Sequence, residues 1–227
     1  MDTNDSLVPG FDSEKDDSIQ FPPKFCVVSA DLSFRRPGFA KFVCDTSGDR
    51  PVITDVVTGF VDNKTATRKT TGEILNEITD YMVKFFPGES CFCPSYYVRE
   101  RALDKYASSA RQAVTLEQIF KVVGITDAFL WRCFKREFCE VHPKTVKKNV
   151  TGDGLADKQK VADALSLYVG SREYTVDDES DALAIGIAFL IQNGILETIS
   201  AEKENDDGKE EDRPVSGRRR APGRKSA

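Results

Sequence analysis

The amino-acid sequence predicts an α/β fold with a mixed β-sheet. Two short apolar runs, residues 25–30 and 39–44, flank a Pro–Gly turn and are typical of an antiparallel hairpin. Further along the chain, helix-like and strand-like segments alternate, which favours strands joined by covering helices. The length of 227 residues is enough for one domain with a sizeable core. No internal repeat is visible in the sequence.

The first three expected strands follow one another closely. The run 25–30 (FCVVSA) ends at Asp31, residues 32–38 form the turn, and 39–44 (FAKFVC) is the second strand. Residues 52–61 (VITDVVTGFV) are expected to form a third strand. An Asp at a strand end is also a common turn residue, so Asp31 alone does not indicate a function.

Residues 70–86 are expected to form an amphipathic helix that Thr70 or Thr71 caps and that Pro87 and Gly88 end. Its apolar face consists of Ile74, Leu75, Ile78, Met82 and Phe85. Residues 95–98 (SYYV) predict a short strand that runs directly into Glu100. Because Glu100 has an Arg on each side, a surface ion pair is the simpler explanation of this acid.

Residues 108–123 predict a second helix with an apolar face formed by Ala113, Leu116, Ile119 and Phe120. Residues 129–134 either extend this helix past Gly124 or form a separate short element. Residues 138–141 predict another strand. The basic segment 143–154 (PKTVKKNVTGDG) is expected to be a loop, and residues 156–169 a helix.

The last predicted helix lies within residues 175–195 (TVDDESDALAIGIAFLIQNGI) and begins with Asp177, Asp178, Glu179 and Asp181. The rest of the segment is apolar on all sides, which is typical of a buried helix. Its first-turn carboxylates therefore lie at the rim of a core, near the positive end of the helix dipole. Asp178 and Asp181 share one helix face. Acidic residues are also common at helix starts, so these acids alone do not indicate a function.

Charge is concentrated at the two ends of the chain. Residues 1–19 carry a net charge of −5, residues 201–212 again −5, and residues 213–227 +6, so the middle is nearly neutral. Like-charge runs are typical of disorder. We therefore expect an acidic disordered tail over 1–20, one domain over 21–200, and a disordered acidic and then basic tail over 201–227. The basic end is either an electrostatic arm for nucleic acid or a solvated tail.

The sequence shows no apolar run long enough for a membrane span and no signal peptide at its start. Cys26 and Cys44 lie in strand-like runs and are expected in the core. Cys91 with Cys93, and Cys133 with Cys139, do not have the spacing of a usual zinc site. Reduced thiols in a cytoplasmic protein are the expectation.

Four acids stand at strand ends or at a helix start: Asp31, Glu100, Asp178 and Asp181. A carboxylate set without histidine or cysteine partners suits hard divalent cations such as Mg²⁺. Two such ions can serve phosphodiester hydrolysis, one by activating water and one by stabilising the leaving oxygen. Spacing alone does not show that these acids meet in space.

Four segments carry a more specific pattern. VVSADLSFRRPGFAKF has an Asp after a strand, then a turn and a Gly, and SYYVRERAL has a Glu that ends a strand. HPKTVKKNVTGDGLADKQKVADAL is a basic stretch with a following helix, and DDESDALAIGIAFL contains D-x-x-D-A-L-A-I. Together they resemble the RuvC family of Holliday-junction resolvases, within the ribonuclease H-like superfamily, over about residues 24–196. The last two segments, in this order and spacing, are the most specific.

The resemblance implies a ribonuclease H-like mixed five-stranded sheet flanked by helices. It also implies that Asp31, Glu100, Asp178 and Asp181 are metal ligands and catalytic residues. Asp177 competes with Asp178, but only Asp178 has the family spacing to Asp181. Lys147 and Lys158 match basic positions that the family uses near the scissile phosphate; a solvated basic segment is the alternative. His142 is interpreted as a structural residue.

The function implied by the resemblance is a crossover junction endodeoxyribonuclease that makes paired symmetric nicks in four-way or branched DNA. Two Mg²⁺ ions per active site are implied, with Mn²⁺ as a substitute, in a cytoplasmic homodimer. Where cellular members carry an aromatic, this chain has Leu103, with Tyr106 nearest. That departure and the charged tails look more like phage-encoded members, which would work in the host cytoplasm.

Two other functions stay open at this point. The same fold also serves nucleases that act on flaps, other branched DNA or RNA–DNA hybrids, because fold does not settle substrate. A non-catalytic scaffold that binds junctions is the other alternative, although all four acids are present. An actin-like ATPase also opens with a strand and an acid, but the sequence shows no matching second phosphate loop.

Overall fold

The structure is a computed structural model that describes residues 19–63, 69–86, 95–102 and 110–199. The predicted tails lie outside these residues, apart from Ile19 and Gln20. Along the chain, the described elements are β1 (Lys24–Asp31), β2 (Gly38–Asp45), β3 (Val52–Phe60), α1 (Thr71–Phe85), β4 (Ser95–Glu100), α2 (Ala110–Phe134), β5 (Cys139–Val141), α3 (Pro143–Thr151), α4 (Lys158–Val169) and α5 (Asp177–Gln192).

The five strands form one mixed sheet in the order β3-β2-β1-β4-β5. β1, β2 and β3 pair antiparallel, and β4 runs parallel to both β1 and β5. In the hairpin register Asp31 lies opposite Gly38. The predicted hairpin and the predicted mixed five-stranded sheet with flanking helices are therefore confirmed.

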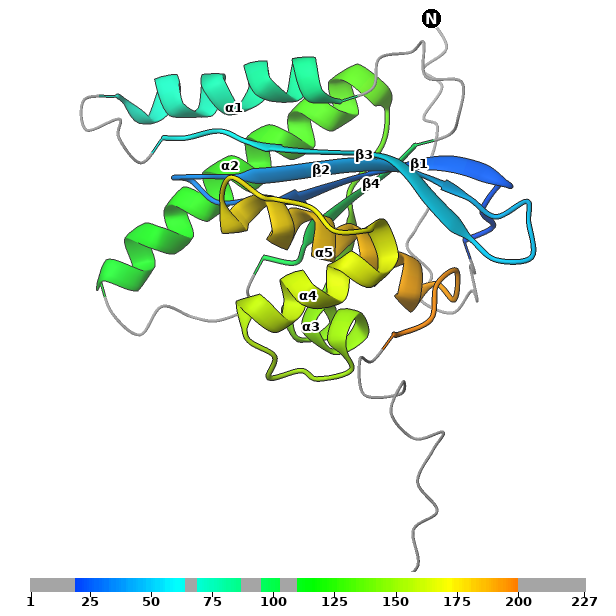
Figure 1. The fold of residues 1–227 in the computed structure, drawn as a ribbon. Helices are drawn as coiled ribbons and strands as arrows, with labels where there is room; N and C mark the ends of the chain where they lie inside the picture. Colours follow the sequence, from blue (N-terminus) through cyan, green and yellow to red (C-terminus); the bar gives the residue numbers. More distant parts are fainter. Residues whose placement is uncertain (1–18, 64–68, 87–94, 103–109, 200–227) are drawn as a thin grey trace, which may run out of the picture.

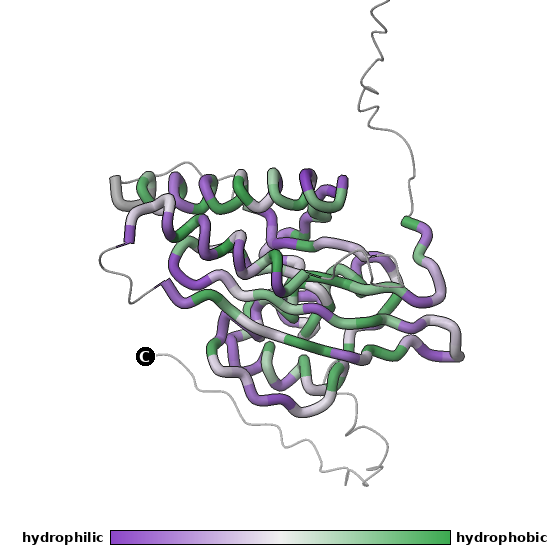
Figure 2. The backbone as a smooth tube through the Cα atoms, turned by 90° about the horizontal axis from the view of Figure 1, so that it is seen from above, coloured by the Kyte–Doolittle hydropathy of each residue, from purple (hydrophilic) through white to green (hydrophobic). Residues whose placement is uncertain are grey.

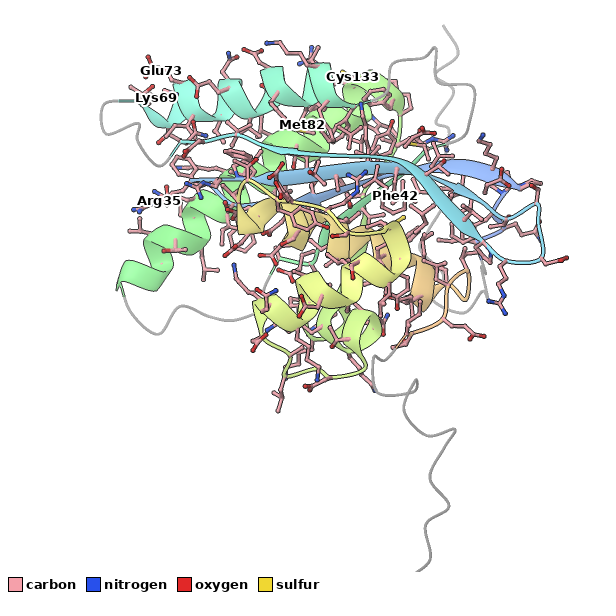
Figure 3. The ribbon with its side chains drawn as sticks, in the orientation of Figure 1. Arg35, Phe42, Lys69, Glu73, Met82 and Cys133 are labelled. Carbon is pink, nitrogen blue, oxygen red and sulfur yellow. The ribbon has the colours of Figure 1, made fainter. Side chains whose placement is uncertain are left out.

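Helices cover both faces of the sheet (Figure 1). α1 and α2 lie on one face, and α3, α4 and α5 lie on the other. Each face has its own apolar cluster. Met82 of α1 belongs to the first cluster and Phe42 of β2 to the second, and both side chains are labelled in Figure 3. The sheet thus separates two cores that share its strands.

α1 forms where its amphipathic pattern predicts it. Thr70 is the N-cap, and its hydroxyl accepts a hydrogen bond from the N–H of Glu73, whose carboxylate accepts in return from Thr70 N–H. Hydrophilic and hydrophobic residues alternate along the helix in Figure 2. The buried side chains are Ile74, Ile78, Met82 and Phe85, while Leu75 is half-buried. Pro87 and Gly88, expected to end the helix, lie outside the described residues.

The expected loop at 143–154 is wrong, because residues Pro143–Thr151 form helix α3. Pro143 occupies the first turn, where its missing N–H needs no partner. His142 is the N-cap, and its Nδ1 accepts a hydrogen bond from Lys144 N–H. Gly152 ends the helix in the left-handed conformation with φ of 76°. Val146 and Val150, one turn apart, bury against α5.

α2 continues through Gly124 to Phe134, so the extended-helix alternative is confirmed. The expected apolar face is only partly correct. Ala113 and Phe120 are exposed, and the fully buried apolar side chains lie further along, at Val122 and Leu130. Figure 1 shows the reason: the first half of α2 extends past the edge of the sheet, so only its second half covers the core.

Within the described residues, no helix is long and apolar enough to cross a membrane. Cys26 and Cys44 are buried in the two cores, as expected. Cys133 is exposed at the end of α2, while Cys91 and Cys93 lie outside the described residues.

Candidate active site

Asp31 and Glu100 end two neighbouring parallel strands, β1 and β4. Ala30 pairs with Arg99 in the sheet register, which places the next residues, Asp31 and Glu100, at the same level. Side chains alternate along a strand, and Phe25 and Val27 of β1 face the α5 side. Asp31 therefore faces the same side, as does Glu100. The carboxyl ends of adjacent parallel strands are a common location for functional sites.

Asp178 and Asp181 come from the first turn of α5, which packs on that same side. Gly38, opposite Asp31 in the hairpin, makes this approach possible. A Cβ atom on Gly38 would lie 1.9 Å from the backbone carbonyl oxygen of Asp178, so only glycine fits there. Backbone contact between the hairpin and the start of α5 therefore brings the acids of β1 and α5 together.

Glu179 holds this helix start in place. Its carboxylate is buried and accepts hydrogen bonds from the N–H groups of Thr175 and Val176, at 2.7 and 3.2 Å. The hydroxyl of Thr58 on β3 donates a third bond to the same side chain, at 3.2 Å. Val176 at the N-cap has no side-chain oxygen, and the Glu179 carboxylate instead accepts from the N–H groups just before the first turn. This acid has a structural role that the sequence pattern did not separate from its neighbours.

A cavity of about 210 Å³ opens between the sheet and helices α3, α4 and α5. Its polar lining consists of Asp31, Glu100, Asp181, Lys147 and Lys158. The remaining wall is largely apolar, with Val146, Val161 and Ile185 among its residues. Five of the six residues singled out in the sequence therefore meet at one cavity.

Asp178, the sixth, is not part of this lining. Its Oδ2 lies 3.9 Å from Nη1 of Arg36, in the turn between β1 and β2, and its side chain is 22% exposed. Arg36 also pairs with Asp62 at 3.5 Å. Arg36 was not singled out in the sequence, because its partner Asp178 lies far along the chain.

The acids raise one another's pKa. Burial, the largest cause, and nearby negative charge raise the pKa of Asp31 to about 7. Those charges belong to Asp181, Glu100 and Asp178. Burial also raises the pKa of Glu100, and Asp181 adds to that effect. Burial and mutual repulsion therefore both make these carboxylates harder to ionise.

Lys158 offsets part of this charge. Its Nζ lies 3.2 Å from Oδ2 of Asp177 and 3.4 Å from Oδ2 of Asp181. Burial raises the pKa of Asp181, while the charge of Lys158 and its hydrogen bond act in the lowering direction. Lys147 donates a 2.8 Å hydrogen bond to the carbonyl of Ala156, which ties α3 to the segment before α4.

Asp177 and Asp178 differ in their surroundings. The Asp177 side chain is 72% exposed and pairs with Lys158, outside the cavity. Asp178 is close enough to Asp31 to raise its pKa, whereas Asp177 is not among the groups that do so. This difference favours Asp178 over Asp177 as a partner of the other three acids.

The chemistry of the cluster fits a hard divalent cation, because its donors are carboxylate oxygens and its unbalanced charge is negative. As the side chains stand in the described residues, no group of three or more His, Cys, Asp or Glu is close enough to hold an ion. Binding a cation therefore requires the carboxylates to turn toward a shared point. Leu103 and Tyr106, the departure noted in the sequence, lie outside the described residues.

Comparison with known proteins gives a partial match in sequence. No family model matches the chain. A stretch of 63 residues is 40% identical to the crossover junction endodeoxyribonuclease RuvC of Brachyspira hyodysenteriae. This stretch covers 28% of the present chain and 39% of that protein, so the match spans about two-fifths of the relative's length.

The fold comparison covers much more of the chain. The structure of RuvC from Thermus thermophilus matches with a TM-score of 0.55 at 17% identity. The match covers 77% of the present chain and 100% of the solved one. A second T. thermophilus RuvC structure, in complex with a Holliday junction substrate, matches with the same score and 99% coverage. The chain therefore has the ribonuclease H-like fold of RuvC, and it resembles RuvC in sequence along the stretch that they share.

Proposed function

We propose that this protein is a Mg²⁺-dependent, structure-selective DNA endonuclease that resolves four-way junctions by paired nicks. The observation that carries the proposal is the single cavity at which Asp31, Glu100 and Asp181 meet Lys147 and Lys158. Phosphodiester hydrolysis requires carboxylates that bind a divalent cation and positive groups that bind the phosphate, and this cavity has both. The sequence match and the fold match to RuvC support the same reaction.

In this proposal Asp31, Glu100, Asp178 and Asp181 would hold two Mg²⁺ ions, for which Mn²⁺ can substitute. When bound, the ions supply water activation and charge stabilisation at the leaving oxygen. The residues of the chain do the positioning. Lys158, already beside Asp181, and Lys147, at the cavity wall, place positive charge where phosphoryl charge develops. Apolar residues of the wall lower the local dielectric around these charges, which strengthens their interactions.

The substrate in this proposal is four-way or branched DNA, and the acting species is a homodimer. Two symmetric nicks require two active sites related by a twofold axis, which a dimer of this chain supplies. The products would carry 5′-phosphate and 3′-hydroxyl ends. Such ends can be rejoined by a ligase, so ligation of the nicked products tests the chemistry independently of the substrate.

The test is a cleavage assay on a synthetic immobile four-way junction, with flap, RNA–DNA hybrid and linear duplex alongside, with and without Mg²⁺. Wild type is compared with Asp181→Asn, which keeps the size of the side chain and removes its charge. Asp80→Asn is the matched control, because Asp80 is an exposed acid on α1, across the sheet. Paired, metal-dependent nicks in the junction are expected from wild type and Asp80→Asn only.

The other outcomes have distinct meanings. Cleavage of flaps or hybrids in place of the junction would support the proposed active site but show that the proposed substrate is wrong. Tight junction binding without nicking of any substrate would favour the scaffold function. Undiminished cleavage by Asp181→Asn would remove this acid from the catalytic set.

A further inference from the structure

A second, polar groove adjoins the catalytic cavity. It has a volume of about 440 Å³ and runs between α4 and residues 170–177, which lead into α5. Lys158 lines both the groove and the cavity. The groove and the cavity are therefore neighbours that meet at Lys158.

The groove is lined by groups that can form hydrogen bonds. Gln159 and Ser166 contribute from α4, and Ser171 and Thr175 from the facing segment. Tyr174 is half-buried in the wall and offers part of an aromatic ring. A volume of this size falls within the range of ligand sites. Grooves that hold one nucleic-acid strand combine positive charge with aromatic side chains, and Lys158, Arg172 and Tyr174 supply both here.

Arg172 is the charged group in the groove that is available to a ligand. Asp177 is paired with Lys158, and Asp163 accepts a 2.9 Å hydrogen bond from Gln159 Nε2. Arg172 is exposed and makes no ion pair with any residue in the described part of the chain. Its guanidinium can therefore bind a phosphate without giving up an existing partner.

We propose that this groove holds the cleaved DNA strand on one side of the scissile phosphate, and that Arg172 binds a backbone phosphate there. The proposal rests on the proposed function and adds a binding residue to it. A strand must continue in both directions from the phosphate in the cavity, and the shared Lys158 makes the groove its neighbouring path. Phosphate contacts of this kind fix the register of the strand.

The experiment measures binding of a four-way junction by proteins that carry Asp181→Asn, so that the DNA stays intact. Arg172→Gln is compared with Arg50→Gln in this background. Arg50 is an exposed arginine between β2 and β3, at the end of the sheet away from Asp31. Arg172→Gln is expected to weaken binding about tenfold, the effect of losing one hydrogen-bonded charge. The slope of log affinity against log salt should fall by about one. Arg50→Gln should change neither quantity.

A second measurement locates the phosphate. Neutral methylphosphonates are placed one at a time along the strand on both sides of the scissile position. At one position, the methylphosphonate should weaken binding by the protein that keeps Arg172. The same methylphosphonate should not weaken binding by the Arg172→Gln protein any further. Additive losses at every position would overturn the assignment, as would equal salt slopes for the Arg172→Gln and Arg50→Gln proteins.

Failure of the inference can be told apart from failure of the proposed function. Wild type that cleaves the junction while Arg172→Gln binds like its control refutes only the groove assignment. Wild type that neither binds nor cleaves any branched DNA refutes both. Thermal melting of both arginine variants checks that the fold is intact, and an exposed substitution is expected to leave the melting temperature unchanged.

Discussion

The hydroxyl of Ser29 donates a 2.7 Å hydrogen bond to the backbone carbonyl of Ala182, across the interface between β1 and α5. Ser29 is fully buried and lies two residues before Asp31 on the same face of the strand. Ala182 directly follows Asp181. Together with the Gly38 contact, this bond holds the strand that carries one acid against the helix that carries another.

Replacing Ser29 with alanine should disturb both stability and the site. Loss of the buried hydrogen bond is expected to lower the free energy of unfolding by about 1 kcal/mol, measured by urea denaturation. Nicking of a four-way junction should fall as well, because the position of Asp31 relative to Asp181 is then less well fixed. Ser47→Ala, at an exposed turn hydroxyl that bonds Asp45, serves as the control and should change neither. Normal nicking by a destabilised Ser29→Ala protein would contradict the positioning role.

Much of this arrangement was predictable from sequence because single residues leave clear local signals. The hairpin follows from two apolar runs around Pro37 and Gly38, and α1 from its apolar repeat behind the Thr70 cap. The spacing of the acids in the sequence could not predict that their side chains lie close together, because this depends on the register between β1 and β4 and on how α5 packs. The resemblance to a family supplied that step.

The features that were missed depend on weak or non-local signals. α3 has a basic, polar composition that favours a loop, and its helical signals were Pro143 at its start, Gly152 at its end and the Val146–Val150 pair. Phe120 was assigned to a buried face because periodicity gives the apolar side of a helix and not the extent of the sheet beneath it. Arg36 pairs with Asp178 across 142 positions of sequence, which no local pattern predicts.

Gly38→Ala should displace the start of α5. The added Cβ would meet the carbonyl oxygen of Asp178 at 1.9 Å, and backbone cannot rotate away as a side chain can. We expect a loss of stability of about 1–3 kcal/mol, the usual range for overpacking, and a large drop in nicking. Gly124→Ala is the control, since a Cβ there meets no atom within 4 Å. It should raise stability by about 0.5–1 kcal/mol, because alanine favours the helix. Equal effects of the two substitutions would refute the contact.

The metal-free protein should lose stability as pH rises from about 4 to about 7. The pKa of Asp31 lies at about 7 in the folded chain and near its ordinary value of 3.8 when unfolded. Between these values the folded state binds more protons than the unfolded state, so raising the pH favours unfolding. At pH 8 without metal, Asp31→Asn should therefore be more stable than wild type, on the order of 2 kcal/mol.

Urea denaturation of both proteins at pH 5 and pH 8 in a chelator measures this difference. Added Mg²⁺ should stabilise wild type at pH 8 and have little effect on Asp31→Asn, because a ligand that binds only the folded state raises its stability. A difference between the two proteins that is the same at both pH values would show that the ionisation of Asp31 is not its source.

Lys158→Gln should change both the rate of nicking and its dependence on pH. The positive charge of Lys158 lowers the pKa of Asp31 and Asp181, so its removal leaves both carboxylates harder to ionise. Cation binding needs ionised carboxylates, and the acidic limb of the rate profile should therefore move to higher pH. Loss of positive charge at the phosphate should also lower the maximal rate about 10²-fold.

Lys160→Gln is the matched control for this prediction. Lys160 lies on the same helix, is similarly exposed, and pairs with Asp153 instead of the cavity acids. It should leave the rate and its pH profile unchanged. If Lys158 served only to pair with Asp177 and Asp181, raising the pH would restore the full rate of Lys158→Gln. A rate that stays low on the high-pH plateau instead places the Lys158 charge on the phosphate during cleavage, because the carboxylates are then fully ionised in both proteins.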